Sequence, residues 1–103
     1  MAGYRPVIAP AVADRIRRLA PELKRAVREA IRLIGTDPWR GEALKRELED
    51  YLKFRVRRYR IVYRVDRAAK TVAIVAIGHR SSVYEEASDR VRAGTTGEGK
   101  PRR

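Results

Sequence analysis

One stretch of eleven residues, Lys53 to Tyr63 with the sequence KFRVRRYRIVY, constrains the fold of this chain more than any other. From Lys53 to Arg57, basic and apolar side chains alternate strictly. A period of two indicates a β-strand with one face in a core and the other in water. From Lys53 to Arg64 there are six basic residues and no acidic one. Because neighbouring cations on a sheet repel each other and weaken the fold, this face predicts a polyanionic partner.

The overall charge favours the same class of partner. The chain has 103 residues, the size of one domain. Its formal net charge of +12 and isoelectric point near 11.0 are typical of nucleic-acid-binding proteins. No apolar run approaches the roughly 18 residues of a membrane-spanning helix. The first ten residues lack the apolar region of a signal peptide, and the helical segments carry charges of both signs. These features predict a cytoplasmic protein that does not contact membranes.

Two residue types that bind metals are scarce in this sequence. The chain has no cysteine and a single histidine. This composition excludes a disulfide framework and thiolate ligands, and it argues against a zinc site. We therefore expect neither a metal nor a cofactor.

The first third of the chain predicts a strand followed by two helices. Tyr4 to Ile8 has the pattern of a strand, and Pro6 indicates a sheet edge or the start of the strand. The helices begin near Pro10 and Pro21, because proline suits the first helical position. Apolar residues recur at helical spacing in both, at Val12, Ile16 and Leu19 in the first and at Leu23, Val27, Ala30, Ile31 and Ile34 in the second.

The link between these helices is so short that we expect an antiparallel hairpin with one apolar face on a sheet. Gly35 predicts the end of the second helix, in a left-handed conformation. Thr36 to Glu42 (TDPWRGE) predicts a loop. Within it, Trp39 is either a platform for base stacking or a hydrophobic anchor that pins the loop to the helices. Ala43 to Asp50 is compatible with one or two helical turns or with a solvated charged loop.

Three strands are predicted next. Leu52 to Arg57 and Tyr59 to Val65 form a hairpin with a tight turn near Arg58. Asp66 to Lys70 forms a second hairpin loop. Thr71 to Ile77 (TVAIVAI) is almost entirely apolar and rich in β-branched residues, so it should be the central strand, buried on both faces.

The C-terminal part predicts a short helix and a tail. The helix spans Ser81 to Arg92, with Ser81 or Ser82 as its cap and Glu85 completing a capping box. Residues 95–103 predict a disordered basic tail, which leaves one domain at residues 1–94. The expected fold is α+β in the order β-α-α-β-β-β-α. Its N-terminal helical hairpin packs on a mostly antiparallel, twisted sheet.

Two arginines are the first candidates for chemistry. Arg60, on the second strand of the hairpin, and Arg80, after the buried strand, are expected to reach the same face. With Lys53, they would surround one phosphate and stabilise a pentacoordinate transition state electrostatically. Tyr84 lies just beyond, suited to stacking on a base or to handling a proton. The alternative is that these cations are solvated and only make the protein soluble.

His79 is the one side chain that titrates near neutrality without perturbation. It is therefore a candidate general acid or base. A structural histidine, hydrogen-bonded to a loop at the end of a strand, is the competing interpretation.

The blocks Tyr59 to Asp66 (YRIVYRVD) and Val72 to Ile77, followed by Gly78 to Arg80 (GHR) with Val83 and Tyr84 behind, resemble the RelE/ParE toxin superfamily. The helical hairpin, the Asp-Pro loop and the length of the chain agree with this resemblance, which covers about residues 4–92. It implies a RelE-like fold and a toxin of a type II toxin–antitoxin pair. RelE-like members enter the ribosomal A site and cut mRNA there. The attacking group is the RNA's own 2′-hydroxyl, so no metal is needed.

The resemblance also implies roles for individual residues. Lys53 and Arg55 fall on the basic strand positions of RelE, and Arg60 on its phosphate-binding arginine. Arg80 falls on the arginine implicated as general acid, and Tyr84 on the tyrosine that stacks on the mRNA base. A lysine can stand at the position of Arg55 in RelE, so the role of general base moves here to Lys53 or Tyr84.

Other cations are assigned more general roles. The hairpin is two residues shorter than in RelE, which blurs the correspondence at its tip. Basic residues there and further along the second strand are expected to attract ribosomal RNA, namely Arg57, Arg58 and Arg64. His79 belongs to a GHR block that many relatives share, where it can be purely structural.

Two other functions remain open on this resemblance. ParE-type relatives inhibit DNA gyrase and cut no RNA, and a third possibility is a non-catalytic binder of ribosomal RNA. Any of these would need restraint by a cognate antitoxin, expected to be small, encoded nearby and acidic in its C-terminal segment. We expect the toxin alone to be a monomer that forms a hetero-oligomer with its antitoxin.

Overall fold

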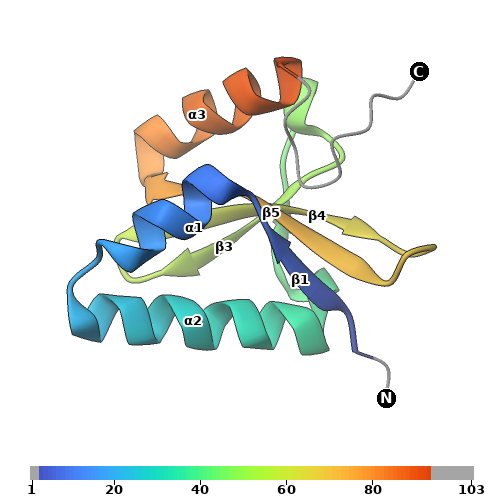
Figure 1. Ribbon diagram of the computed structural model, residues 1–103. Coiled ribbons are helices and arrows are strands. Elements are labelled where there is room, and N and C mark those ends of the chain that lie inside the picture. The colour runs from blue at the N-terminus through green and yellow to red at the C-terminus, as the bar shows by residue number, and fades with distance from the viewer. Residues whose placement is uncertain (1–2, 94–103) are drawn as a thin grey trace.

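The computed structural model describes residues 3–93 of the chain, and the predicted tail at 95–103 lies outside them. The described part forms one five-stranded sheet with three α-helices (Figure 1). The elements in chain order are β1 (Arg5–Ile8), α1 (Pro10–Arg17), α2 (Pro21–Thr36), β2 (Glu42–Ala43), β3 (Leu52–Val56), β4 (Tyr59–Asp66), β5 (Thr71–His79) and α3 (Arg80–Arg92).

The strands lie in the order β1-β5-β4-β3-β2. β1 pairs with β5 in parallel, and every other pair is antiparallel. The predicted α+β fold and its mostly antiparallel sheet are therefore confirmed, as is the placement of the Pro6 strand at an edge. The order differs from the prediction by one addition, the two-residue strand β2 between α2 and β3.

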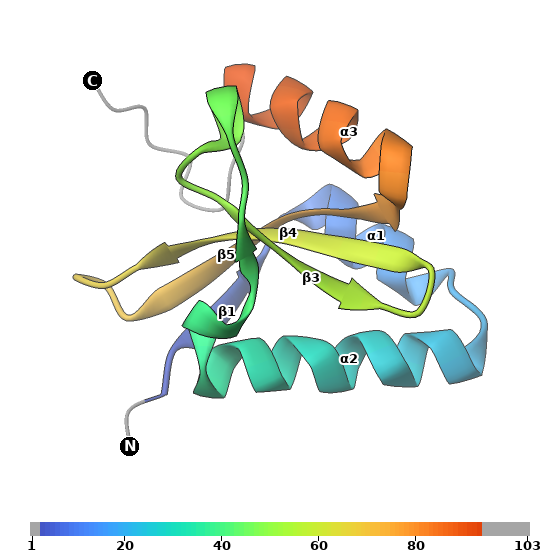
Figure 2. The ribbon, with the colours of Figure 1, turned by 180° about the vertical axis from the view of Figure 1, so that it is seen from behind.

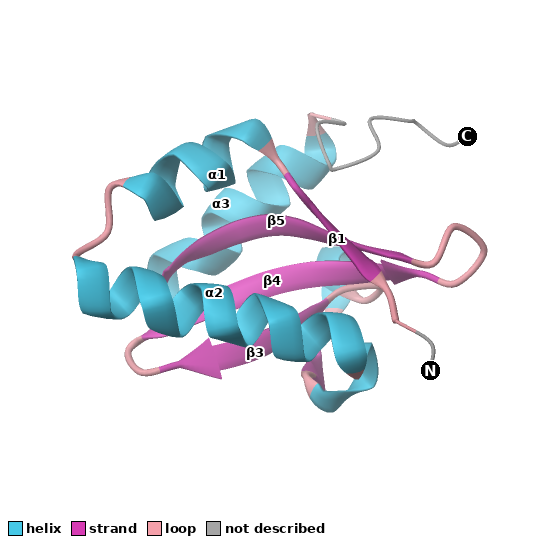
Figure 3. Ribbon diagram, turned by 60° about the horizontal axis from the view of Figure 1, so that its bottom comes forward, coloured by secondary structure: helices cyan, strands magenta, loops and turns pink. Residues whose placement is uncertain are grey.

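The helices divide between the two faces of the sheet. α1 and α2 run antiparallel on one face, as predicted, and α3 covers the other (Figures 1 and 3). The core on the first face includes Val12 and Ile16 of α1 and Val27 and Ile34 of α2. The second core lies under α3 and the segment before β3, and it includes Leu48, Tyr51, Val75, Val83 and Ala87. Figure 2 shows that segment and α3 on the same side of the sheet.

β5 contributes to both cores. Val72, Ile74 and Ile77 face the helical hairpin, whereas Ala73, Val75 and Ala76 face α3. The predicted burial of this strand on both faces is confirmed. It is the second strand of the sheet, however, and β4 holds the central position. The pattern of apolar residues could not show which of β4 and β5 is central, because both strands have covered faces.

The predicted end of the second helix at Gly35 was wrong. α2 continues to Thr36, and Gly35 is a buried helical residue. A Cβ at Gly35 would lie 2.9 Å from the carbonyl oxygen of Tyr4, and the Tyr4 N–H donates to the Gly35 carbonyl at 2.8 Å. The glycine is needed because the chain just before β1 approaches the helix this closely, and no left-handed turn is involved.

The loop predicted at Thr36 to Glu42 was only partly correct. Pro38–Arg40 forms one turn of 3₁₀-helix, and Glu42 begins strand β2. Trp39 does not pin this segment to the helices, because its side chain is 49% exposed and lies under the guanidinium of Arg67, 5.1 Å from the ring centre. The buried residue of the turn is Pro38 instead. In the ambiguous segment that follows, Arg46–Leu48 forms a second 3₁₀ turn.

The start of α3 also differs from the prediction. The helix begins at Arg80, with His79 as its N-cap and no side-chain hydrogen bond to cap it. The capping box predicted from Ser82 and Glu85 is therefore absent. β5 ends at His79, so strand and helix follow each other without a loop. Within residues 3–93, no helix is long and apolar enough to cross a membrane.

Candidate functional site

The hairpin of β3 and β4 carries the basic ladder seen in the sequence. Arg57 and Arg58 form its two-residue turn, and Arg57 has a left-handed backbone with φ 57°. The register places Arg55 directly opposite Arg60, while Phe54 opposite Ile61 packs into the helical-hairpin core. Phe54 and Arg55 thus point to opposite faces, as the alternation predicted.

The end of β5 adds the remaining cations. Arg60 is also paired with Gly78, so the chain leaving β5 at His79 and Arg80 runs beside it. These residues line an open hollow of about 370 Å³. We call it the arginine hollow, and it is formed by Arg55, Arg57, Arg58, Arg60, His79 and Arg80. None of its six lining residues is acidic, so it offers guanidinium donors from three strands or turns to a single anion.

Lys53 and Tyr84 meet although they come from different elements. The Lys53 ammonium lies 5.7 Å from the centre of the Tyr84 ring, within the range of a cation–π contact. The same ammonium is 3.4 Å from a carboxylate oxygen of Glu42. β2 pairs Glu42 directly with Lys53, so the short strand missed in the sequence supplies this carboxylate.

His79 occupies the border between the arginine hollow and the other face of the sheet. Its ring packs at 41° against Tyr59, with ring centres 4.6 Å apart. Tyr59 belongs to the helical-hairpin side. His79 also lines the arginine hollow, so its exposed imidazole can reach a ligand there. This ring contact replaces the loop hydrogen bond expected for a structural histidine.

A second hollow adjoins the first. We call it the edge hollow; its volume is about 340 Å³, and it is lined by Arg40, Gly41, Glu42, Lys53, Phe54, Arg55 and Arg60. Arg55 and Arg60 belong to both hollows, which therefore adjoin each other along the hairpin. Sequence reasoning missed Arg40 and Glu42. The only available signal was the Asp-Pro loop, which does not reveal that its far end pairs with β3.

Tyr63 holds the wall of the edge hollow in place. Its hydroxyl donates to the Pro38 carbonyl at 2.8 Å and accepts from the Gly41 N–H at 3.1 Å. The side chain is fully buried, and this burial raises the pKa of the Tyr63 phenol. A Cβ at Gly41 would collide with that hydroxyl and lie 2.7 Å from the Lys53 carbonyl oxygen. Only glycine lets the turn approach β3 this closely.

α3 is fastened beside the site by ionic contacts. Arg15 of α1 forms a 3.2 Å ion pair with Glu86 of α3, and Glu86 also contacts Arg90 at 2.9 Å. The Arg15 guanidinium lies over Gly78, 3.4 Å from where a Cβ would stand. These contacts fix the first turns of α3, which carry Arg80 and Tyr84.

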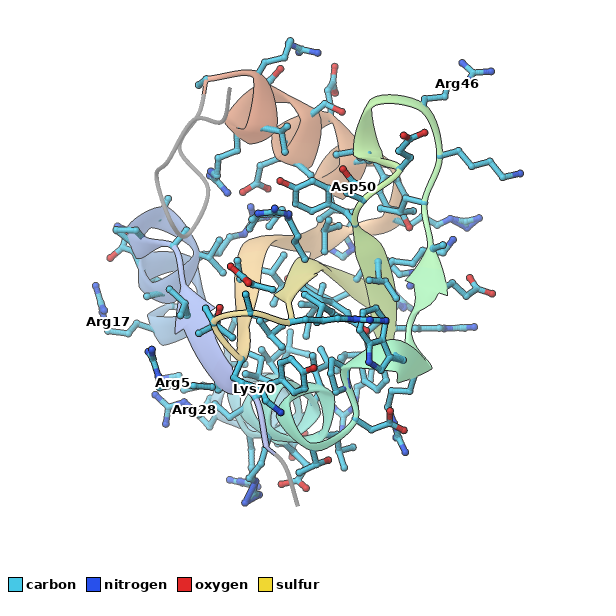
Figure 4. The ribbon with its side chains drawn as sticks, turned by 90° about the vertical axis from the view of Figure 1, so that its right-hand side faces the viewer. Arg5, Arg17, Arg28, Arg46, Asp50 and Lys70 are labelled. Carbon is cyan, nitrogen blue, oxygen red and sulfur yellow. The ribbon has the colours of Figure 1, made fainter. Side chains whose placement is uncertain are left out.

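Not every predicted site residue is close to the others. Arg64 lies opposite Ala73, towards the other end of β4, and lines neither hollow. Further basic side chains, including Arg5, Arg17 and Arg28, gather beside β1 at the opposite edge of the sheet (Figure 4). Among residues 3–93, no group of three or more His, Cys, Asp or Glu side chains could hold a metal ion.

This arrangement suits charge stabilisation of a phosphate. Arginine donors in a fixed fork match phosphate oxygens, and they stabilise charge that develops on those oxygens in a transition state. Lys53 and Tyr84 provide an amine and a phenol at one end of the cluster. The imidazole of His79 is a third polar group that lines the arginine hollow.

Comparisons with known proteins agree with the resemblance seen in the sequence. The profile of a family described as the ParE toxin of the type II toxin–antitoxin system parDE matches residues 8–84. Toxin RelG from Mycobacterium tuberculosis is 35% identical over 71 residues, which make up 67% of this chain and 82% of RelG.

Solved structures share the fold. The toxin–antitoxin complex RelBE2 from M. tuberculosis contains a chain with 30% identity and a TM-score of 0.71, covering 79% of this chain and 95% of that one. A mutant of the Escherichia coli toxin RelE in the free state has 22% identity and a TM-score of 0.72, covering 86% and 98%. From the profile match and the identity to RelG together, this chain belongs to the RelE/ParE superfamily of toxins of type II toxin–antitoxin systems.

Proposed function

We propose that this toxin is a ribosome-dependent endoribonuclease that cuts mRNA through the RNA's own 2′-hydroxyl, without a metal ion. The observation that carries the proposal is the pairing of Arg55 with Arg60 next to Arg80, in a hollow without any acidic lining residue. Such a cluster is costly for a folded protein, and a phosphodiester is the ligand that would compensate for it.

In the proposed reaction, the 2′-oxygen attacks the adjacent phosphorus and the bond to the 5′-oxygen breaks, which leaves a cyclic phosphate. Arg60 and Arg80 donate hydrogen bonds to the phosphate oxygens, on which negative charge grows in the transition state. Lys53 as its neutral amine, or Tyr84 as its phenolate, takes the proton of the 2′-hydroxyl, and the two side chains are in contact. Arg80, which also lines the hollow, stabilises the negative charge on the leaving 5′-oxygen, which then takes a proton from solvent water.

The other cations have binding roles in this proposal. Arg55, Arg57 and Arg58 hold the RNA backbone, because they line the arginine hollow with Arg60. Arg64 lies outside it and contributes to long-range attraction of ribosomal RNA. His79 is positioned to exchange a proton with a ligand in the hollow, and its contact with Tyr59 orients the ring.

The proposed physiological partner is a cognate antitoxin with an acidic segment. The net charge of +12 and the uncompensated arginine hollow favour an acidic covering chain. The similar chain in RelBE2 is part of a toxin–antitoxin complex. Co-purification with the neighbouring gene product would test this, and absence of a small acidic partner would count against it.

Inhibition of DNA gyrase is the second candidate function. The observation that favours it is that residues 8–84 match the family described as the ParE toxin of the type II toxin–antitoxin system parDE. A gyrase inhibitor would trap cleaved DNA in a supercoiling reaction and leave programmed ribosomes with intact mRNA. In that case the basic cluster would bind an acidic protein surface, and the gyrase and ribosome assays run side by side distinguish the two functions.

The decisive experiment adds purified protein to ribosomes programmed with a defined mRNA. We expect cleavage by the wild type, and loss of cleavage in Arg60→Gln and Arg80→Gln variants that keep their thermal stability. Arg28→Gln, which removes one charge at the opposite edge of the sheet, is the matched control and should still cut. Intact mRNA under conditions where a related toxin cuts would refute the proposal.

A further inference from the structure

We propose that the edge hollow is a second RNA subsite, in which Arg40 binds a phosphate next to the one held in the arginine hollow. This inference rests on the proposed action on RNA and extends it to a residue outside the expected catalytic set. Its ligand is the sugar–phosphate backbone of a single strand.

The first support is that the two hollows adjoin. Both are lined by Arg55 and Arg60, so one extended ligand that contacts these arginines can occupy both hollows. Lys53 and Arg55 lie on the same face of β3, about 7 Å apart along the strand. Cations repeated at such a spacing suit a chain with repeated charges better than a single small anion.

The second support is the charge of the edge hollow. Its lining contains one carboxylate, that of Glu42, and four cationic side chains, namely Arg40, Lys53, Arg55 and Arg60. The side chains of Arg40 and Lys53 are each bound to an exposed carboxylate, Arg40 to Asp37 at 3.7 Å and Lys53 to Glu42 at 3.4 Å. Exposed ion pairs of this kind contribute little, so phosphates can take the place of both carboxylates.

The third support is the way the wall is built. Tyr63, fully buried, fixes the turn that carries Arg40 through the Pro38 carbonyl and the Gly41 N–H. The Gly41 N–H is therefore already occupied and cannot bind a phosphate. Gly41 presents no side chain, which leaves the floor of the hollow open beside β3. On this wall the donor left for a ligand is therefore the side chain of Arg40.

The test measures binding of two RNA lengths to the full chain at low ionic strength. The probes are a trinucleotide and a hexanucleotide with 2′-O-methyl groups throughout, which removes the attacking hydroxyl and prevents cleavage. The wild type should bind the hexanucleotide more tightly. Arg40→Gln should lower hexanucleotide affinity about tenfold, as for loss of one charged hydrogen bond, and leave trinucleotide affinity unchanged.

Two further measurements sharpen the result. Arg40→Gln should reduce the salt dependence of hexanucleotide binding by about 0.7 in the logarithmic slope, the contribution of one phosphate contact on a single strand. Glu42→Gln should raise hexanucleotide affinity because it removes a competing carboxylate. Arg28→Gln provides the matched loss of charge at the opposite edge, and thermal melts check that each variant is folded.

Several outcomes would overturn the subsite. One is an equal loss of affinity for the trinucleotide and the hexanucleotide in Arg40→Gln, which would indicate that Arg40 acts only through general electrostatic attraction. Another is an unchanged hexanucleotide affinity, and a third is no binding of either RNA by the wild type. A glutamate peptide of equal charge that competes as well as the hexanucleotide would assign the hollow to an acidic protein. Cleavage of mRNA on ribosomes is measured separately, so failure of the subsite and failure of the proposed function give different results.

Discussion

Arg55 and Arg60 lie directly opposite each other on β3 and β4, a pairing of like charges in the middle of the basic hairpin. Directly opposed cations on neighbouring strands destabilise a sheet by roughly 0.2–1 kcal/mol. Because the hairpin keeps both, the folded protein is less stable than one with a neutral residue at either position.

Arg60→Gln is therefore expected to raise the free energy of unfolding by about 0.5 kcal/mol. The same change should reduce cleavage on ribosomes by about 10²-fold or more, as for loss of one transition-state donor. Urea unfolding at low and high salt measures the first effect, and salt should stabilise the wild type more than the variant. A variant that is less stable than the wild type at low salt would contradict this account.

Arg57→Gly tests the turn of the same hairpin. Arg57 has φ 57°, a conformation that costs a non-glycine residue roughly 1–2 kcal/mol and a glycine almost nothing. We expect the variant to be more stable by about 1 kcal/mol and to bind RNA more weakly, because one cation leaves the arginine hollow. Thermal unfolding and RNA titration measure the two effects. Arg58→Gly, without a left-handed backbone at that residue, should bring no gain in stability.

Tyr63→Phe tests the fastening of the turn at Pro38 and Gly41. The variant leaves a buried carbonyl and an N–H without their partner, which should cost about 1–3 kcal/mol. Tyr51→Phe, also buried and aromatic but in the α3-side core, provides a comparison. Hydrogen exchange at Gly41 should accelerate in the Tyr63 variant alone.

The pH dependence of stability provides a separate check on Tyr63. Burial raises the pKa of its phenol in the folded protein, so the unfolded chain loses this proton first as the pH rises. The unfolded state then binds fewer protons, and stability falls as the pH rises past about 10, the ordinary tyrosine value. This fall should be smaller in Tyr63→Phe, and equal alkaline slopes in both proteins would show that Tyr63 does not cause it.

Gly35→Ala tests the approach of β1 to α2. Alanine favours a helix interior by about 1 kcal/mol over glycine, yet here its Cβ would lie 2.9 Å from the Tyr4 carbonyl oxygen. We expect net destabilisation, seen as a lower melting temperature. Gly3→Ala is the matched control, because nothing lies within 4 Å of its Cβ position. A rise in melting temperature for Gly35→Ala would mean that β1 can move away freely.

The sequence predicted those parts of the fold that local patterns determine. The alternation from Lys53 to Arg57 identified the basic face, and the apolar run in β5 identified a strand buried on both sides. The positions of Arg60 on the hairpin and of Arg80 after the buried strand predicted a shared face, and both residues line the arginine hollow. Each of these follows from side-chain periodicity or from a strand ending beside its neighbour.

The features that the sequence did not predict depend on contacts between residues that are distant in sequence. Gly35 has the position of a helix terminator, but its role is set by Tyr4, which lies against it just before β1. Strand β2 has two residues and exists because it pairs with β3. Arg40 joins the site only because Tyr63, 22 residues beyond Gly41, holds the intervening turn. No local pattern encodes these contacts.

The absence of a loop between β5 and α3 has a consequence for how such toxins can diverge. His79 ends the strand and Arg80 starts the helix. One inserted or deleted residue there would rotate every later helical side chain by about 100°. Tyr84 would leave Lys53, and Val83 would leave its core. Residue types in this segment can therefore change more readily than its length, and homologues that keep the site should align through it without gaps.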